Sequence, residues 1–473
     1  MKFFAPLCYN IYMDIEKRAR RQSMRIIISE IVMVVAVIVT VSILAFVVSG
    51  YWLGSDGRIE RQGLLQIYST PTGADVEVDQ NPTSWLQRTN TSKTLSAGQH
   101  TIKLTKDNYD SWSRTINISE GLLYRLHYPR LFLKERANES AFDFSGNFAT
   151  ISPDRNTMLL GFNTTTWQTF NLDSDNAKPV PLSLVAILPF TNLTADTTSG
   201  LFSGEILQAD WATDNEHVLL KIKNTDSINW LILNVKNPAN SFNLTKEFNA
   251  DFSEIKILDG SANNLLAIWN GNLHRIDVPA KQISTILAEN VNSFDYYNQD
   301  VIFSTASSLS ILKLGSGEIT ELQSITEPVR VVMMKFYDDE YIGVIGKSSI
   351  ALYLKKDFEH KMTFDLSFYP EEVKVGQGGE FVTMFTGGKI ATLDMEAMEV
   401  TEWSTDTDKF GWLDGSMIYA VKDGNLNVYD FNGLNSRTLA TNVSAHFPVT
   451  ITSDKYLYYF QDGTLIREYL FEK

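Results

Sequence analysis

The feature that most constrains this chain is a long apolar segment near its N-terminus, with basic residues before it and aromatic residues after it. Between residues 26 and 48 only Ser29, Glu30, Thr40 and Ser42 are polar. Twenty-three residues, at about 1.5 Å of rise each, form a helix of roughly 34 Å, which is enough to cross the core of a bilayer. The sequence therefore predicts one transmembrane helix, followed by more than four hundred residues.

Charge predicts the orientation of this helix. Residues 1–25 carry six Lys and Arg residues against two Asp and Glu residues, whereas the whole chain has a net charge of −15. Because Lys and Arg are enriched on the cytoplasmic side of membrane helices, residues 1–25 are expected to form a cytoplasmic tail and the acidic remainder to be exported. The residues expected at the two membrane interfaces are Arg18, Arg20, Arg21, Arg25, Tyr51 and Trp52.

The apolar segment is longer than the core of a cleaved signal peptide, which has about 7–15 residues. We therefore expect residues 26–52 to be a signal anchor, with a cleaved signal peptide as the alternative. Residues 1–12 differ from the basic stretch after them, so Met13 is an alternative start to Met1. The sole cysteine, Cys8, precedes the helix, so the exported part has no disulfide and no cysteine-based metal site. An exported part without disulfides is typical of a bacterial envelope protein rather than of a secreted eukaryotic protein.

After an expected linker over residues 53–62, residues 63–133 have the pattern of a small β-domain. Apolar residues alternate with polar ones, as in half-buried strands. Turn residues separate the alternating stretches at Pro71-Thr72-Gly73, at Ala97-Gly98 and at Asp107-Asn108. The domain is small and has no cysteine, so its core is expected to be modest.

This segment resembles a PEGA domain, a small β-module found mainly in surface and envelope proteins. The resemblance covers residues 65–79, 95–104 and 106–109. Its motif residues here, which we expect to be structural, are Pro71, Thr72, Gly73, Ala74, Asp79, Gly98, His100 and Tyr109. Three positions depart from the family pattern, since Thr72 replaces Glu, and both Gln80 and Asn108 replace Gly. The resemblance implies an extracytoplasmic location and no particular chemistry.

From residue 134 to residue 473 the chain repeats a unit of apolar strands separated by polar turns. The units are expected to begin near Phe142, Leu207, Phe252, Asn292, Val329, Val373, Asp408 and Ser444. A repeat of about forty residues with four short strands is typical of a β-propeller blade. The sequence thus predicts eight blades, with seven blades as the alternative, a pair of β-sandwiches as the competing fold, and an insertion around residues 177–204.

Two features of the repeats bear on the type of propeller and on its closure. Ser152-Pro153-Asp154 and Trp211-Ala212-Thr213-Asp214 resemble degraded forms of the Trp-Ser-Pro-Asp-Gly pattern of Tol-type periplasmic propellers. The last unit has room for only three strands. We therefore expect residues 128–133, or the residues just after them, to supply its fourth strand.

No motif for catalysis or for cofactor binding occurs. The patterns HExxH, GxxxxGK[ST] and GxSxG are absent, and no two of the six histidines have ligand spacing. Asp173-Ser174-Asp175-Asn176 comes nearest to a calcium loop but is too short and lacks the Gly. We expect no catalytic, metal-binding or cofactor-binding residue and no small-molecule cofactor, and the acidic charge argues against nucleic acid as a partner.

Together these patterns predict an all-β exported part, a PEGA-like domain and a seven- or eight-bladed propeller, on a single N-terminal transmembrane helix. The expected function is that of a non-enzymatic single-pass envelope protein of a bacterial cell membrane. The PEGA-like domain would be a spacer or a wall-proximal contact, and the propeller a binding platform for an envelope protein or a glycan. A sensor that signals through the helix is a further possibility.

The alternative is an extracytoplasmic hydrolase or lyase that acts on glycans, with carboxylates in the propeller funnel. Converging carboxylates with strongly shifted pKa values would favour this enzyme, whereas a funnel lined by apolar and amide residues would favour binding. Most tryptophans fall in strand patterns and are expected to pack in the core, although one or two on a propeller face would be able to stack on sugars. The tryptophans considered are Trp85, Trp112, Trp167, Trp211, Trp230, Trp269, Trp403 and Trp412.

Overall fold

A computed structural model of the chain shows two compact units. One contains residues 1–104 and 113–129, and the other contains residues 105–112 and 130–473. The residues that the structure describes are 24, 29–46, 51–53, 59–82, 88–161, 166–183, 195–196, 201–202, 205–223, 227–258, 260–376, 378–407 and 409–470. The predicted interface residues Arg18, Arg20, Arg21 and Arg25 lie outside them.

The apolar segment forms a helix over Ser29–Phe46, the one described helix that is long and apolar enough to cross a membrane. Its apolar side chains, such as Val34 and Leu44, are exposed rather than buried in a protein core. By length and composition this helix is either a single membrane span or a signal sequence. Strand β1 (Tyr51–Leu53) follows, so the predicted helical range 26–52 extends too far, and Tyr51 and Trp52 lie in a strand.

The small unit contains two four-stranded sheets. In one, β2 (Ile59–Ile67) pairs antiparallel with β1 and β5 (Thr91–Ser96), and parallel with β8 (Leu123–Leu126). The other has the order β4 (Asn81–Pro82), β3 (Asp75–Val78), β6 (Gly98–Thr105) and β7 (Trp112–Ile118). Leu65, Ile67 and Ile102 are fully buried, as the alternating pattern predicts. Because β2 begins at Ile59, the last four residues of the predicted linker are strand.

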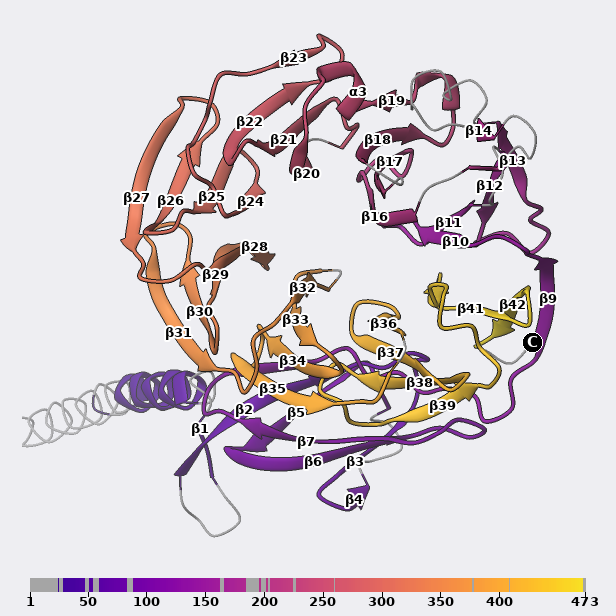
Figure 1. The fold of residues 1–473 in the computed structure, drawn as a ribbon. Coiled ribbons are helices and arrows are strands. Elements are labelled where there is room, and N and C mark those ends of the chain that lie inside the picture. Colours follow the sequence, from indigo (N-terminus) through magenta and orange to yellow (C-terminus); the bar gives the residue numbers. More distant parts are fainter. Residues whose placement is uncertain are drawn as a thin grey trace, which may run out of the picture. The chain divides into compact units, whose positions relative to one another are not determined.

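The large unit contains eight four-stranded antiparallel sheets among the described residues (Figure 1). The first four are β10 (Phe148–Ile151), β11 (Thr157–Gly161), β12 (Thr166–Asn171) and β13 (Val180–Ser183); β16 (Glu205–Trp211), β17 (His217–Lys223), β18 (Ile228–Asn234) and β19 (Phe242–Asn243); β20 (Phe252–Ile257), β21 (Asn264–Trp269), β22 (Asn272–Asp277) and β23 (Gln282–Ile283); and β24 (Ser293–Tyr297), β25 (Asp300–Ser304), β26 (Ser308–Lys313) and β27 (Glu318–Ser324).

The other four sheets are β28 (Arg330–Phe336), β29 (Asp339–Ile345), β30 (Ser349–Leu354) and β31 (Glu359–Asp365); β32 (Glu372–Val375), β33 (Phe381–Thr386), β34 (Lys389–Asp394) and β35 (Glu399–Ser404); β36 (Lys409–Trp412), β37 (Met417–Lys422), β38 (Asn425–Asp430) and β39 (Arg437–Ala440); and β40 (Thr450–Thr452), β41 (Tyr456–Gln461), β42 (Thr464–Tyr469) and β9 (Asn138–Asp143). Shorter elements are β14 (Ala195–Asp196), β15 (Leu201–Phe202), η2 (Pro238–Asn240) and α3 (Leu244–Phe248).

The sheets are the blades of a propeller, with the first strand of each nearest the centre of the ring (Figure 1). The eighth blade takes its fourth strand, β9, from the residues just after 128–133, as expected. The predicted start at Phe142 was wrong because this residue lies in β9, and the first blade begins at Phe148. The predicted insertion also starts too early, because β13 still belongs to the first blade. Ser444 lies well before β40, and Asp408 lies outside the described residues.

Apolar contacts join each blade to the next. Seven buried clusters each draw residues from two adjacent blades. The remaining junction, between the sixth and seventh blades, includes Phe381 and Phe431, whose rings stack with centroids 4.0 Å apart. The ring is therefore closed by side-chain packing at every junction and by the β42–β9 ladder within the last blade.

Candidate binding site on the third blade

A tight hairpin places three polar or aromatic residues at one end of the third blade. Strands β21 and β22 are joined by Asn270-Gly271, and Trp269 is paired with Asn272. Both turn residues have positive φ, 50° at Asn270 and 77° at Gly271. Asn-Gly is the preferred sequence for a two-residue turn of this kind, because both residues tolerate the left-handed region. The turn thus fixes where Trp269, Asn270 and Asn272 stand.

The outer edge of the same blade is interrupted by a bulge. Strand β23 pairs with β22 at only two positions. Ser284 N then donates to Arg275 O at 2.8 Å, and Leu287 N donates to Leu273 O at 2.9 Å. Between these bonds, Thr285 and Ile286 leave the ladder, and both are exposed. Bulges at sheet edges commonly re-aim side chains, and here the bulge leaves room beside β22.

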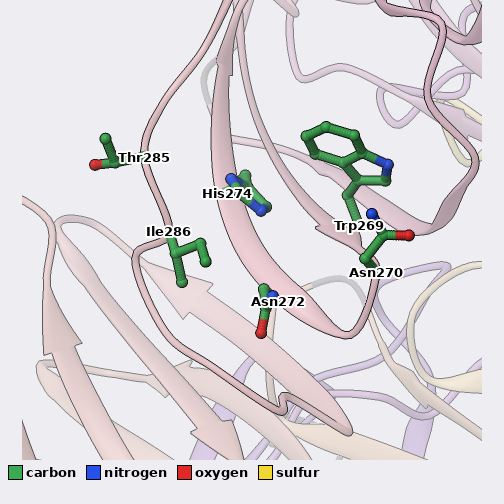
Figure 2. Close-up of a pocket in the computed structure, with 6 residues that line it drawn as sticks. All are labelled: Trp269, Asn270, Asn272, His274, Thr285 and Ile286. Carbon is green, nitrogen blue, oxygen red and sulfur yellow. The ribbon is translucent and has the colours of Figure 1, made fainter.

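The hairpin and the bulge together border a hollow of about 610 Å³. Figure 2 shows Thr285 and Ile286 on one side, Trp269 and Asn270 on the other, and His274 and Asn272 on the strand between them. The six lining residues are Trp269, Asn270, Asn272, His274, Thr285 and Ile286. This volume lies within the range of about 300–1,000 Å³ that is usual for small-ligand pockets.

Trp269 has both a packing role and an open edge. It is half-buried and contacts the core cluster that includes Leu265 and Ala267 of the same strand. Its ring centroid lies 5.5 Å from that of His274, at an interplanar angle of 54°. Its indole N–H makes no hydrogen bond to any residue that the structure describes. An aromatic surface and a free donor therefore border the hollow.

Hydrogen bonds fix the polar groups of the strand between. His274 is buried, with 6% of its surface exposed, and its Nδ1 lies 3.1 Å from Ser284 O. Since a carbonyl oxygen only accepts, Nδ1 carries a hydrogen, and this tautomer of imidazole has its acceptor at Nε2. Asn272 Oδ1 accepts from Asn290 N at 3.1 Å, which orients its amide and leaves Nδ2 as a donor.

The remaining polar groups of the hollow are also available. Within the described part of the chain, neither the side-chain amide of Asn270 nor the hydroxyl of Thr285 has a hydrogen-bond partner. No Lys, Arg, Asp or Glu is among the lining residues. The hollow thus offers donors and acceptors without formal charge, together with the apolar surfaces of Trp269 and Ile286.

The innermost strands of the ring carry charges instead. Asp210 on β16 is exposed as a residue, but the protein around its carboxyl group displaces water and thereby raises its pKa. The hydrogen bond from Gln208 and the charges of Lys256 and Lys374 lower the pKa and partly offset this rise. Burial likewise raises the pKa of Glu254 on β20, with Lys256 opposing. For both acids the positive charge of Lys256 lowers the pKa and partly offsets the effect of burial, because a nearby cation favours the ionised carboxylate.

Lys256 links neighbouring blades. Its Nζ lies 3.7 Å from Glu254, 3.1 Å from Asp295 Oδ1 and 2.7 Å from Phe294 O. The other oxygen of Asp295 accepts from Met333 N of the fifth blade at 2.7 Å. This chain of bonds runs from the third blade to the fifth, an arrangement that serves to align the inner strands.

The PEGA-like motif residues are held within the β-structure. Asp79, with φ of 51°, lies 2.6 Å from His100 Nδ1 and accepts from Thr101 N at 2.8 Å. The hydrogen bond from His100, with that of Thr101, lowers the pKa of Asp79. Gly73 and Gly98 have φ of 77° and 127°, which side chains resist.

The other motif residues are also structural. Ala74 is buried, and its N–H donates to Thr89 Oγ1 at 2.9 Å. Pro71 O accepts from Ser69 Oγ at 2.6 Å, next to Thr72 in the same turn. Tyr109 is buried in the large unit, in an isolated bridge with Leu133. The residues Ser69 and Thr89 were missed by sequence reasoning, because a lone hydroxyl carries no pattern.

The weak calcium candidate has structural contacts. Asp173 Oδ1 accepts from Ser453 Oγ, and Asp175 accepts from the hydroxyl of Tyr456. Among the described residues, no group of three His, Cys, Asp or Glu residues is placed to hold a metal ion.

The tryptophans fall into groups that sequence reasoning did not separate. Trp112, Trp167 and Trp230 are fully buried, while Trp211, Trp403 and Trp412 are half-buried. Trp85 lies outside the described residues. Trp269 is the one that borders the hollow. The sequence signal that distinguishes it from the other tryptophans is the Asn-Gly turn directly after it, which the sequence analysis did not use.

Comparisons with known proteins identify the family of the small domain. The family model described as PEGA domain matches residues 62–129, which confirms the predicted resemblance. No curated protein matches the chain. Among solved structures, the C-terminal WD40 domain of Sif2 is 11% identical, with 72% of this chain and 99% of that chain covered and a TM-score of 0.49. Hsv2 of Kluyveromyces lactis is 14% identical over 54% of this chain and 90% of that one, with a TM-score of 0.38. The designed Ika8 protein is 9% identical over 70% and 98%, with a TM-score of 0.43.

Proposed function

We propose that this chain is a non-enzymatic binding protein, anchored to a membrane by its N-terminal helix and exported beyond that helix. The propeller is its binding platform for an envelope protein or glycan. The observation that carries this proposal is the hollow of the third blade, where unpaired neutral donors and acceptors lie beside an aromatic ring. Such a combination is typical of sites that bind small ligands.

The location is supported by charge and by the small unit. The helix Ser29–Phe46 follows the basic residues 1–25, which favours a cytoplasmic N-terminus. The match to the PEGA domain model points to the outer side of the membrane. The acidic, cysteine-free body fits a bacterial envelope, where a large single-sign charge keeps a protein soluble.

The charged inner strands are less suited to glycan hydrolysis than the sequence-based alternative requires. That reaction needs one carboxyl group as the acid and a second as the base or nucleophile. Here Glu254 shares Lys256 with Asp295, and Asp210 is opposed by Lys256 and Lys374. Burial raises the pKa of Asp210 and of Glu254, as a proton donor would need, but in each case the charge of a lysine opposes this rise and favours the ionised form. We therefore favour a binding role for the ring.

One experiment tests binding and the absence of turnover together. Full-length protein in lipid nanodiscs is presented to purified glycan and purified protein fractions of a bacterial envelope, with empty nanodiscs as the control. We expect retention of one fraction, without release of reducing ends or unsaturated ends from the glycan. Release of such ends that depends on the protein would establish an enzyme, and failure to retain either fraction would refute the platform.

The cysteine content allows a direct test of topology. In a Cys8→Ser background, which has no other cysteine, a single cysteine replaces Ser316, an exposed turn residue of the fourth blade. A membrane-impermeant maleimide is expected to label Ser316→Cys in intact cells, and to label Cys8 of the natural chain only after lysis. The opposite pattern would contradict the predicted orientation.

A further inference from the structure

We infer that the hollow of the third blade is a binding site for a neutral pyranose ring of a glycan. This inference rests on the proposed binding role and assigns the class of ligand and the site. Trp269, Asn270, Asn272, His274 and Thr285 supply its recognition groups.

A pyranose presents two kinds of surface, and the hollow has a counterpart for each. One face of the ring consists of C–H groups, which pack on a flat aromatic side chain. Trp269 is half-buried, so its inner part is held by the core while its remaining surface faces the hollow. Holding the indole in this way reduces the conformational entropy that a ligand must overcome on binding.

The hydroxyl groups of a sugar each donate and accept, so a sugar site needs both functions. The donors are the indole N–H of Trp269 and Nδ2 of Asn272, whose other amide atom is already bonded to Asn290 N. The acceptor fixed by geometry is Nε2 of His274, since its Nδ1 is directed to Ser284 O. Asn270 and Thr285 each supply both a donor and an acceptor.

The charge of the surroundings favours a neutral sugar over an acidic one. The nearest cation on the central strand, Arg275, is already bonded through two nitrogens to Asn264 Oδ1, at 3.2 and 2.7 Å. Lys281 is paired with Glu247 at 2.7 Å. Since no free cation lines the hollow and the chain carries a net charge of −15, a carboxylated or sulfated sugar would be repelled.

The shape of the hollow suits a ring that belongs to a longer glycan. Ile286 is 47% exposed and Thr285 is exposed, so the bulge is an open wall rather than a lid. A chain of sugars is thus able to enter and leave on either side of the bound ring. Binding at a single ring is expected to be weak, and a surface-bound glycan would gain avidity from several copies of the protein.

The test uses full-length protein in nanodiscs on an array of neutral cello-, malto-, manno- and chito-oligosaccharides, with oligogalacturonates as the acidic set. We expect binding to at least one neutral series and none to the acidic set. For the best oligosaccharide, Trp269→Ala is expected to weaken binding about tenfold or more. Trp269→Phe, which keeps an aromatic ring but loses the N–H, is expected to be intermediate.

Matched controls separate loss of the site from loss of the fold. Tyr369→Ala removes another exposed aromatic ring of the propeller, 46% exposed, and is expected to leave binding unchanged. Each variant is compared with the natural chain by far-UV circular dichroism and unfolding midpoint. Asn272→Ala removes the Nδ2 donor together with the hydrogen bond from Asn290 N, and it provides a second probe of the site whose effect on stability is measured in the same way.

Two results would overturn the inference. One is that no neutral oligosaccharide binds. The other is that binding persists unchanged in folded Trp269→Ala and Asn272→Ala variants. In either case, retention of an envelope fraction by the same nanodiscs would leave the platform standing, so the two proposals fail separately.

Discussion

Two regions differ in whether their polar groups are paired. One is the closing blade, by which we mean the eighth blade with Arg130 and its seventh-blade partner Asp414. The other is the rim, the residues that border the hollow of the third blade. At the closing blade, Arg130 is buried and its Nε lies 3.0 Å from Asp414 Oδ2, while its Nη2 donates to Asp454. Asp414 Oδ1 also accepts from the backbone N–H of Ser416 and of Met417, each at 2.8 Å. At the rim, by contrast, the indole N–H of Trp269 has no partner among the described residues.

This difference separates polar groups that hold the fold from polar groups that are available to a ligand. Burial alone would raise the pKa of Asp414, but Arg130 and the backbone N–H groups outweigh it and lower that pKa. The closing blade therefore depends on every partner being present. The open polar groups of the rim have no partner within the described part of the chain, so removing such a group is expected to affect binding more than stability.

The largest effect is expected from Arg130→Met. This substitution leaves the carboxylate of Asp414 buried without the cation that is bonded to it, and removing one partner of a buried pair costs about 3–5 kcal/mol. Denaturant unfolding of the full-length protein measures the loss. Lys347→Met is the matched control, because it breaks the exposed pair with Glu327 and should cost at most about 1 kcal/mol. An equal loss of unfolding free energy in the two variants would contradict the expected difference between a buried and an exposed ion pair.

Asp414→Asn is expected to cost about 3 kcal/mol at pH 7, and the cost should depend on pH. The pKa of Asp414 is lowered by folding, so its ionised form stabilises the folded state. This contribution is complete above the unfolded pKa of about 3.9 and is lost as the pH falls through the folded pKa. The stability difference between wild type and variant should thus be constant near neutral pH and shrink in acid. A difference that stays constant down to acid unfolding would contradict this.

Gly271→Ala tests the turn that places the rim residues. A Cβ at Gly271 would meet no atom within 4 Å, so its cost comes from the backbone φ of 77° alone. For an alanine in the left-handed region this cost is about 1–2 kcal/mol. Gly271→Asn is expected to cost less, since Asn tolerates this geometry. Thermal unfolding ranks the variants, and equal stability of all three would show that the turn is not strained.

The smallest effect on stability is expected from Thr285→Ala. Its side chain is exposed and makes no hydrogen bond to a described residue, so the change in unfolding free energy should stay within about 0.5 kcal/mol. Calorimetric unfolding checks this value. If the proposed sugar site is correct, the same variant weakens glycan binding despite its unchanged stability. A large loss of stability would show that the Thr285 side chain supports the fold, as the paired polar groups of the closing blade do, and would contradict this prediction.

Most of the fold was predictable because it follows from repeated local patterns. The predicted starts Leu207, Phe252, Asn292, Val329 and Val373 lie within two residues of the first strand of a blade. The missing fourth strand of the last blade was predicted from its length alone. The start at Phe142 failed because the closing strand β9 has the same alternation as a first strand, so local sequence does not distinguish them.

The candidate site was predictable only in part. The Asn270-Gly271 turn and the neighbouring Trp269 are visible in the sequence as a hairpin with an aromatic residue. The bulge at Thr285 and Ile286 is not, because it depends on which residues of an irregular edge keep their bonds to β22. The partnership of Arg130 and Asp414 joins residues 284 positions apart, and only closure of the ring brings them together.

Closure by β9 also has a consequence for how the molecule is made. Residues 138–143 emerge from the ribosome long before their partners at 464–469. Until then the early strand is an exposed edge that invites association with other chains. The eighth blade is therefore completed only after β42 has been synthesised and has paired with β9. A chain whose synthesis stops before β42 would leave β9 without its partner strand. Such a chain is expected to be degraded, because a protein that is not fully folded is open to proteolysis.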